Sequence, residues 1–261
     1  MNEVNKTLYI PLFGKAYVSQ KGIIISDKSA EKIWAAEGFL LRGKSKSKWL
    51  AYYMAIRSAV FDEWVRERMK DAADATVIHI GCGLDSRVLR VGTSGHRWYD
   101  VDFSEVIAER RRYFEESDEY KMIEGDARGE GWLSKIQESD QAIVVMEGVS
   151  MYLEPTEIKR LFEALSQKFN KISLLMDAYS SFAARMSRYK NPINDVGVTR
   201  VYGIDNPEIV AGDELLFLAE REMTPQKFID ELSDGEKWIF SKLYAGKTAK
   251  KLYKLFEYGK R

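Results

Sequence analysis

The sequence has one cysteine, two histidines and no excess of charge of either sign, and each shortage excludes a class of protein. Cys82 has no partner for an internal disulfide, which favours a reducing compartment such as the cytoplasm. Two histidines are too few for a multi-histidine centre, so we expect no metal site. The 40 Lys and Arg balance the 40 Asp and Glu, so the net charge recruits no nucleic acid.

Long apolar runs are also missing. No stretch approaches the roughly 18 apolar residues that a membrane-spanning helix needs. The first residues lack a basic region followed by an apolar run, so no signal peptide is expected. The 261 residues, 45% of them hydrophobic, are instead enough for one large domain with a well-filled core. The sequence carries no signal for the oligomeric state.

Residues 77–104 hold the pattern that is most informative about function. An apolar strand runs into Gly81-Cys82-Gly83, a helix follows, and a second strand leads to Asp102. Glycines at such a turn let the backbone approach a ligand closely, because a Cβ would collide with it. A carboxylate at the end of the second strand can accept both hydroxyls of a ribose. The segment therefore predicts a site for an adenosine cofactor.

The glycine spacing separates the candidate cofactors. A dinucleotide site needs G-x-G-x-x-G, and Ser86 occupies the third glycine position. A phosphate-binding loop of the form G-x-x-x-x-G-K-[ST] does not occur in the sequence. S-adenosylmethionine, which has no pyrophosphate, fits the spacing best. A nicotinamide enzyme, a non-catalytic nucleotide-binding protein and a bare strand–turn–helix packing motif stay open as alternatives.

Helices and strands are predicted to alternate along most of the chain. Near-continuous apolar runs are typical of buried parallel strands, which are expected at 76–80, 97–101, 121–124, 141–146 and 171–176. Helices are expected at 47–70, 86–91, 104–117, 156–169, 225–232 and 235–245. This alternation indicates a doubly wound, mostly parallel α/β sheet of the Rossmann-like type.

The other segments are expected to surround this sheet. Residues 1–46 read as irregular, because Gly, Pro and Lys interrupt their apolar clusters. Residues 179–224 break the alternation and predict an insertion that covers the strand ends. The tail at 252–258 is expected to be a final strand, with a helix end as the alternative. We therefore expect one domain with four parts: an N-terminal helical cap (1–70), a cofactor-binding core (71–178), the insertion after the fifth strand (179–224) and a C-terminal completion of the core (225–261).

Acidic residues follow the predicted strands. Asp102, Asp126, Glu147 and Asp177 each stand at or just after a strand end. Ligands of open α/β sheets bind beyond the carboxyl ends of the strands, so these carboxylates should share one crevice. They would repel one another without a positive group between them, and S-adenosylmethionine supplies a sulfonium and an ammonium. Asp177 is expected only to cap the following helix.

Several motifs in succession resemble the leucine carboxyl methyltransferase family, whose members also include bacterial O-methyltransferases of polyketide pathways. The motifs are G-C-G-L-D-S-R, W-Y-D-V-D-F-S-E-V-I, E-G-D-A-R and M-E-G-V-S-M-Y-L, with P-L-F-G-K-A and M-A-I-R-S-A-V-F-D upstream. They run in order from about residue 8 to residue 210. The resemblance implies a class I methyltransferase with S-adenosylmethionine as its cofactor.

The resemblance also implies a role for individual residues. At the methionyl end of the cofactor, Arg57 would bind the carboxylate, a task that suits its planar guanidinium. Lys15 would be a second carboxylate contact, and Glu147 would lie near the ammonium. The turn formed by Gly81, Cys82 and Gly83 would line the same moiety.

At the adenosine end, the resemblance implies that Asp102 takes the ribose hydroxyls. Asp126 would accept a hydrogen bond from the adenine amino group, with the backbone of Ala127 beside it. Four tyrosines are expected near the cleft, where packing is a more ordinary role for them than catalysis: Tyr52, Tyr53, Tyr152 and Tyr179.

The acceptor is harder to infer than the cofactor. After the fourth strand the sequence reads Glu147-Gly148-Val149-Ser150 and lacks the N/D-P-P-Y motif of enzymes that methylate amino groups of bases. A carboxylate, with an unperturbed pKa of about 4, needs no base at neutral pH, whereas a phenol near 10 does. No histidine is obviously placed to serve, so no catalytic residue is assigned. We expect O-methylation of a small acid or polyketide-like molecule, with a protein C-terminus as the alternative acceptor.

A nicotinamide oxidoreductase is a rival from another class of enzyme. Short-chain dehydrogenases carry a Y-x-x-x-K pair near the cleft, and that pair is not found there in this sequence. The presence of Arg57, Asp102 and Glu147 also weighs against a non-catalytic binding protein that has lost its cofactor contacts.

Overall fold

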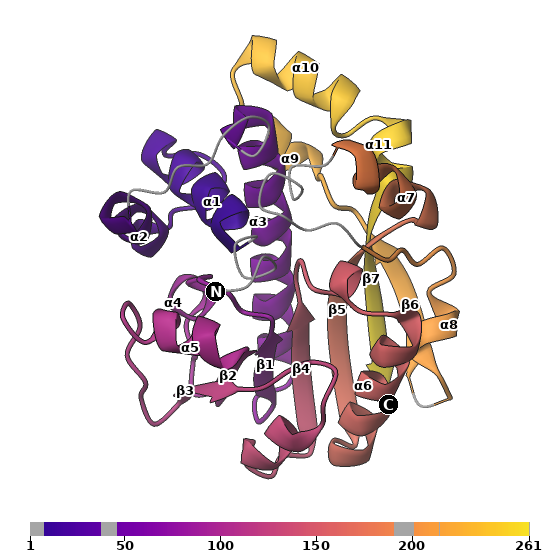
Figure 1. Ribbon diagram of the computed structural model, residues 1–261. Coiled ribbons are helices and arrows are strands. Elements are labelled where there is room, and N and C mark those ends of the chain that lie inside the picture. Colours follow the sequence, from indigo (N-terminus) through magenta and orange to yellow (C-terminus); the bar gives the residue numbers. More distant parts are fainter. Residues whose placement is uncertain (1–7, 38–45, 191–200, 214, 261) are drawn as a thin grey trace.

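The computed structural model describes residues 8–37, 46–190, 201–213 and 215–260. Its centre is a sheet in the order β3-β2-β1-β4-β5-β7-β6 (Figure 1). Strands β1 to β5 are parallel, and β7 lies antiparallel between β5 and β6. The strands are β1 (Thr76–Ile80), β2 (Trp98–Asp102), β3 (Tyr120–Glu124), β4 (Gln141–Met146), β5 (Lys171–Tyr179), β6 (Leu216–Arg221) and β7 (Tyr253–Lys260).

Helices cover both faces of the sheet and crowd its upper end in Figure 1. The α-helices are α1 (Tyr9–Lys21), α2 (Lys28–Glu37), α3 (Lys48–Asp71), α4 (Arg87–Val91), α5 (Ser104–Arg110), α6 (Pro155–Lys168), α7 (Ser181–Lys190), α8 (Glu208–Ala211), α9 (Gln226–Ile229), α10 (Asp234–Leu243) and α11 (Lys247–Leu252). Two short 3-10 helices, η3 (Gly131–Lys135) and η4 (Ser150–Tyr152), follow β3 and β4. The doubly wound, mostly parallel sheet that the sequence predicts is confirmed.

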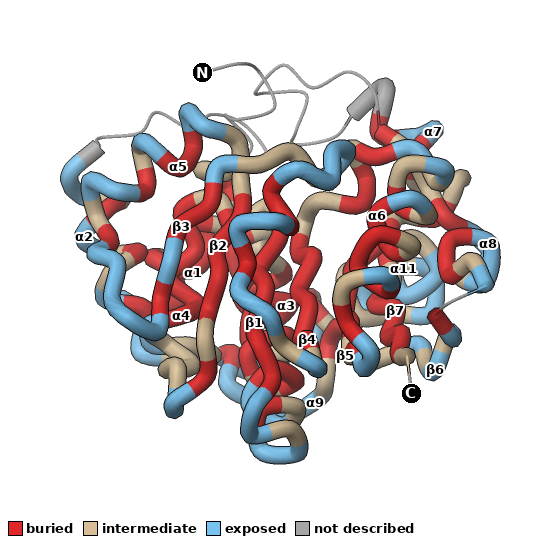
Figure 2. Tube along the Cα trace, turned by 90° about the horizontal axis from the view of Figure 1, so that it is seen from below, coloured by how far each residue is buried: buried red, intermediate tan, exposed pale blue. Residues whose placement is uncertain are grey.

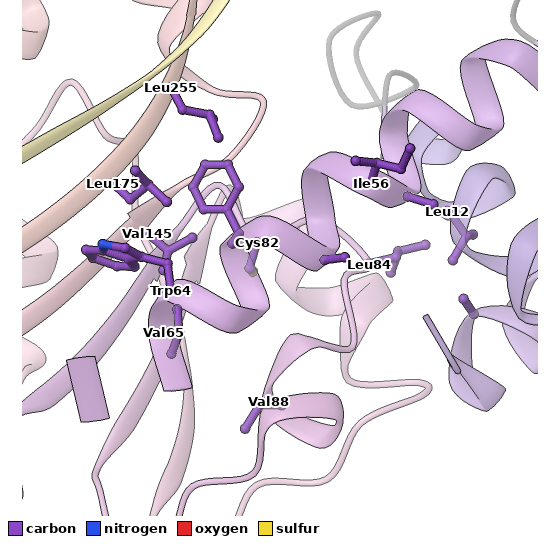
Figure 3. Packing of buried hydrophobic residues seen from close by; sticks show 14 of the residues in the cluster. Leu12, Ile56, Trp64, Val65, Cys82, Leu84, Val88, Val145, Leu175 and Leu255 are labelled. Carbon is purple, nitrogen blue, oxygen red and sulfur yellow. The ribbon is translucent and has the colours of Figure 1, made fainter. Parts of the chain in front are cut away.

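Two hydrophobic cores, one on each face, hold the layers together. On the first face α3 lies against the sheet, and Figure 3 shows Trp64 and Val65 in one cluster with Val145, Leu175 and Leu255 of three different strands. On the second face α6 and η3 pack against the alternate side chains of the same strands. The central strands are buried on both sides, as Figure 2 shows. This explains their near-continuous apolar sequences.

The register of the sheet sets the geometry of its upper edge. Ile80 pairs with Met146, and Met146 pairs with Met176, so β1, β4 and β5 are level near their carboxyl ends. The residues that follow these three positions are therefore brought side by side. The strand order also reverses between β1 and β4, which is where open α/β sheets bind their ligands.

The expectation that residues 1–46 are irregular is wrong for the part that the structure describes. Helices α1 and α2 occupy most of it, and α1 is buried on nearly all sides. Pro11 lies in the first turn of α1, where its missing N–H costs nothing. Gly14 allows close packing, since a Cβ there would lie 3.1 Å from the Ala51 carbonyl oxygen of α3. Proline and glycine commonly interrupt helices, yet both residues lie within the packed helix α1.

The region expected as an insertion also contains part of the sheet. Residues 179–224 include β6, which pairs with β7 at the edge of the sheet. Helix α7 does cover the strand ends, as predicted, and residues 191–200 lie outside the described residues. The division of the chain into four parts stays a prediction.

The helix expected at 104–117 is shorter than predicted. Helix α5 ends at Arg110, after which the backbone forms turns, with the N–H of Tyr113 donating to the Arg110 carbonyl. The final strand is confirmed as β7, and Ser47 precedes α3 as expected, although its side chain makes no capping hydrogen bond.

Candidate cofactor and active site

A cavity of about 1080 Å³ lies beyond the carboxyl ends of β1, β2 and β4. Cavities for drug-sized ligands span about 300–1,000 Å³, so this one has room for a cofactor and an acceptor together. All the residues that the sequence predicted for the cofactor line it: Lys15, Arg57, Gly81, Cys82, Gly83, Asp102, Asp126, Ala127 and Glu147. The tyrosines Tyr53, Tyr152 and Tyr179 line it too, whereas Tyr52 does not.

The glycine turn after β1 forms the floor of the cavity. Gly81 has φ +67°, and a Cβ there would lie 2.1 Å from a methyl carbon of Val149, so no other residue fits. Gly83 also has a positive φ, and its N–H donates to Asp102 Oδ2 at 2.8 Å. The turn is thus tied to the end of β2 through one carboxylate. Cys82 is free and buried, and burial raises the pKa of its thiol.

Asp102 is the last residue of β2 and lies at the edge of the cavity. Burial raises its pKa to about 6, although hydrogen bonds from the Gly83 and Phe103 N–H groups oppose the shift. Each carboxylate oxygen accepts one of these N–H groups. Since a carboxylate has about four lone-pair sites, two stay available to hydroxyl donors. An ionised Asp102 can therefore bind a vicinal diol.

Arg57 of α3 is the centre of the opposite end of the cavity, with only 4% of its surface exposed. Its Nε donates to Glu147 Oε1 at 2.9 Å, and its Nη1 donates to Asp177 Oδ2 at 2.9 Å and to Tyr253 Oη at 2.5 Å. Its Nη2 has no hydrogen-bond partner among the described residues. A guanidinium carries five N–H donors, so Arg57 retains two for an anionic ligand in the cavity.

Glu147 follows β4 and joins two buried arginines. Its second oxygen, Oε2, accepts from Nη2 of Arg87, which is fully buried on α4. Burial alone would raise the pKa of Glu147, but Arg87 and Arg57 outweigh it and lower the pKa to about 2. The carboxylate is therefore ionised across the physiological range. Lys15 lies nearby, with Nζ 3.4 Å from Asp85 Oδ2.

The expectation that Asp177 only caps a helix is wrong. Asp177 lies within β5, which runs three residues past the predicted end, and its side chain is fully buried. It accepts hydrogen bonds from Arg57, from the Tyr253 hydroxyl and from the Gly148 N–H. Asp177 therefore supports the arginine that lines the cavity.

Asp126 and Ala127 follow β3, line the cavity and are less buried. The carboxylate of Asp126 pairs with the side chain of Arg128, with an Nη2 to Oδ2 distance of 2.6 Å, and accepts the Arg128 N–H at 2.9 Å. Arg128 also lines the cavity, a role that the sequence analysis missed although the residue closes the motif E-G-D-A-R.

His79 of β1 lines the cavity but is held in place by its neighbours. Its Nε2 lies 3.2 Å from Arg87 Nη1, which can only donate, so Nε2 is the acceptor. Burial lowers the pKa of His79, which keeps the ring neutral. His79 is therefore a packed, neutral histidine at the wall of the cavity.

The other part of the cavity is apolar and comes from the helices. Its lining residues are Leu50, Met54, Phe182, Met186, Leu243, Tyr244 and Leu252. Phe182, Met186 and Leu243 are 56%, 54% and 67% exposed, so they form an open apolar rim. Tyr179 and Tyr253 also line the cavity, with ring centroids 4.7 Å apart. The sequence analysis missed Tyr253, because it belongs to a strand near the C-terminus.

The described residues hold neither a metal-binding cluster nor a membrane-spanning helix. No group of three or more His, Cys, Asp or Glu residues in them is arranged to hold a metal ion. None of their helices combines the length and the apolar character needed to cross a bilayer.

Comparisons with known proteins agree with this geometry. The profile of the leucine carboxyl methyltransferase family matches residues 10–166, which is more than half of the chain. The chain is 29% identical over 189 residues to TcmP, an O-methyltransferase of tetracenomycin polyketide synthesis from Streptomyces glaucescens, and the match covers 71% of this chain and 70% of TcmP.

A fungal relative and a solved structure extend the comparison. The chain is 26% identical over 179 residues to dpfgK, an S-adenosyl-L-methionine-dependent methyltransferase from Gibberella zeae, and the match covers 63% of this chain and 60% of dpfgK. Magnesium protoporphyrin IX methyltransferase from Synechocystis PCC 6803, solved with bound SAH, superposes with a TM-score of 0.53 at 12% identity, covering 88% of this chain and 93% of that one. This last likeness concerns the fold.

Proposed function

Because the chain belongs to the leucine carboxyl methyltransferase family, it is an S-adenosylmethionine-dependent methyltransferase, and we propose that it methylates an oxygen atom of a small molecule. The observation that carries the proposal is the division of one cavity into two chemically opposite parts. Polar residues at the strand ends, with Arg57 of α3 and Lys15 of α1, form the donor half, and apolar residues of the helices form the acceptor half. The nicotinamide alternative is set aside, because this family transfers methyl groups.

The donor half suits the cofactor residue by residue. Arg57 would bind the methionyl carboxylate through the two N–H groups of Nη2, with Lys15 as the second cation. Glu147, ionised and buried, would attract the ammonium. Asp102 would accept hydrogen bonds from the ribose hydroxyls. Asp126, which pairs with Arg128, would also accept a hydrogen bond from the adenine amino group. When bound, S-adenosylmethionine supplies an electrophilic methyl group on a sulfonium.

The acceptor half favours a carboxylate acceptor. Among the described residues of this half there is no histidine, aspartate or glutamate that could remove a proton at neutral pH. A carboxylic acid is already ionised there, since its unperturbed pKa is about 4. Methyl transfer to it then requires positioning and no proton removal. The apolar rim supports a molecule with a large hydrophobic part, and the polyketide relative supports the same choice over a protein C-terminus.

The free, buried Cys82 fits the proposal of a cytoplasmic enzyme, because thiols persist in a reducing compartment.

Calorimetric titration with S-adenosylhomocysteine tests the donor half, with NADH as the competing ligand and Asp102→Ala as the control. Micromolar binding of S-adenosylhomocysteine that Asp102→Ala abolishes is the expected result. Binding of NADH in its place would overturn the assignment of the donor half.

A methyl-transfer screen tests the acceptor. Aromatic and aliphatic carboxylic acids, the corresponding phenols and a peptide ending in leucine are incubated with S-adenosylmethionine labelled in its methyl group. Methyl esters release labelled methanol in mild base, whereas phenol ethers do not. Label in the phenols or only in the peptide would contradict a small-molecule carboxylate as the acceptor.

A further inference from the structure

The first residue of β7, Tyr253, touches the donor half from a part of the chain that the sequence motifs do not cover. Its hydroxyl accepts from Arg57 Nη1 at 2.5 Å and donates to Asp177 Oδ2. The side chain is 7% exposed and lines the cavity. Of the residues that hold Arg57, Tyr253 is the one that contacts both the guanidinium and its buried carboxylate partner.

We propose that Tyr253 is a positioning residue that directs the free edge of Arg57 toward the carboxylate of the methyl donor. The inference rests on the proposed role of Arg57 in donor binding. Nε and Nη1 are both engaged within the protein, and Nη2 alone is left for a ligand. Whether Nη2 stays free for a ligand depends on which hydrogen bonds the carboxylate of Asp177 accepts.

The hydroxyl of Tyr253 restricts the pairing between Arg57 and Asp177. Arginine and a carboxylate prefer a bidentate pairing, in which two nitrogens face two oxygens. Here Asp177 Oδ1 accepts the Gly148 N–H at 2.8 Å, and Oδ2 accepts the Tyr253 hydroxyl. Only one guanidinium nitrogen, Nη1, reaches Asp177. Without the hydroxyl, Oδ2 would lack one donor and the guanidinium could turn to meet it with Nη2.

The ring of Tyr253 is fixed independently of its hydroxyl. It packs against Tyr179, with centroids 4.7 Å apart, and stacks on Tyr53 at 6.1 Å. The guanidinium of Arg57 lies 5.8 Å from its centroid. Tyr253→Phe therefore retains these ring contacts and removes a single oxygen atom.

The test compares two ligands that differ in the methionyl group. S-adenosylhomocysteine carries the amino-acid carboxylate, and 5′-methylthioadenosine has the same adenosine and a thioether but no amino acid. We expect Tyr253→Phe to weaken binding of S-adenosylhomocysteine about tenfold, the effect of one hydrogen bond to a charged group. Binding of 5′-methylthioadenosine should be unchanged. Calorimetric titration of both ligands gives the two dissociation constants.

Tyr258→Phe is the matched control. Tyr258 is a buried tyrosine of the same strand, and its hydroxyl donates to the Pro207 carbonyl at 3.1 Å, away from the cavity. Tyr258→Phe should leave the affinity for both ligands unchanged. The variant therefore controls for the loss of a buried hydroxyl from β7. If Tyr253→Phe fails to fold, Asp177→Asn is tested in its place. This variant also alters the oxygen atom that meets Nη1, so it should weaken the binding of S-adenosylhomocysteine only.

Three results would overturn the proposal. Unchanged binding of S-adenosylhomocysteine by Tyr253→Phe would show that the hydroxyl does not direct Arg57. Equal weakening of both ligands would indicate a general effect on the cavity. If the unmodified protein binds neither ligand, the assignment of the donor half fails first and the inference fails with it.

Discussion

The donor half and the acceptor half of the cavity are built by different means. The donor half consists of strand ends and the turns that follow them, together with Arg57 of α3 and Lys15 of α1, and most of its charged side chains are buried and paired with one another. The acceptor half consists of side chains from α3, α7, α10 and α11, and its rim is apolar and open. The comparison teaches that the register of the sheet places most of one half, whereas helices beyond the strand ends shape the other.

The largest effect is expected from breaking the buried ion pairs of the donor half. Arg87→Met removes one of the two arginines that pair with Glu147 and one of the two that pair with Asp62, so two buried carboxylates each lose a charge partner. Loss of one member of a buried pair costs about 3–5 kcal/mol. Urea unfolding should show this loss.

The matched control is Arg111→Met, which breaks the exposed pair of Arg111 with Glu124. Exposed pairs contribute about 0–1 kcal/mol. Equal losses in the two variants would contradict the idea that the donor half is held by buried charge.

Asp102→Asn should affect ligand affinity more than it affects the stability of the protein. It removes the charge that we propose accepts the ribose hydroxyls, so the affinity for S-adenosylhomocysteine should fall by roughly 10–100-fold, about 1.5–3 kcal/mol. The raised pKa of about 6 means that ionised Asp102 costs stability at pH 7.5. Asparagine removes this cost, but its NH2 group cannot accept the backbone N–H that one carboxylate oxygen holds. The two effects oppose each other, so without ligand the variant should stay within about 1–2 kcal/mol of the parent stability. A larger loss in thermal unfolding would contradict this.

The pH dependence of donor binding should follow the same carboxylate. The pKa of Asp102 is raised to about 6, so the side chain is protonated at lower pH and ionised at higher pH. The dissociation constant of S-adenosylhomocysteine should rise by about tenfold per pH unit below that value. The stability linked to Asp102 runs in the opposite direction, being fully present below the unfolded pKa and lost as the pH rises through 6. Binding by Asp102→Asn should not vary over this range.

The smallest effect on the fold is expected at the rim of the acceptor half. Phe182→Ala and Leu243→Ala remove side chains that are 56% and 67% exposed. Such surface changes stay within about 0.5 kcal/mol of the parent stability. The KM of a hydrophobic acceptor should rise severalfold while donor affinity stays constant. A matching loss of donor affinity would show that the two halves are not independent.

The contrast between strand ends and helices also explains which site residues could be predicted from the sequence. Asp102 was predictable, because a glycine turn and a following strand place it by local spacing alone. The role of Arg57 followed only from the resemblance to a family, since a helix residue far from the turn has no local signature. Asp177 was misjudged because the predicted strand ended at Met176, whereas β5 runs on to Tyr179 and includes Asp177.

The missed elements have physical reasons too. Pro11 and Gly14 suggested an irregular segment, yet one lies in the first turn of α1 and the other permits close packing against α3. Tyr253 could not be found from spacing, because β7 runs antiparallel to β5 and therefore reaches the site with its first residue. Parallel strands contribute their last residues, which is the pattern that sequence analysis looks for.

The antiparallel strand β7 also has a consequence for how the enzyme becomes functional. The contact between Arg57 and Tyr253 joins residues 196 positions apart, and β7 enters the sheet between β5 and β6. Contacts between residues so far apart in the sequence form slowly, because the entropy of closing a large loop is lost before the contact contributes to stability. A folding intermediate with β1 to β5 in place would hold the glycine turn and Asp102, but its Arg57 would lack one of its partners. Full affinity for the donor should thus be reached only when the antiparallel strand has entered the sheet.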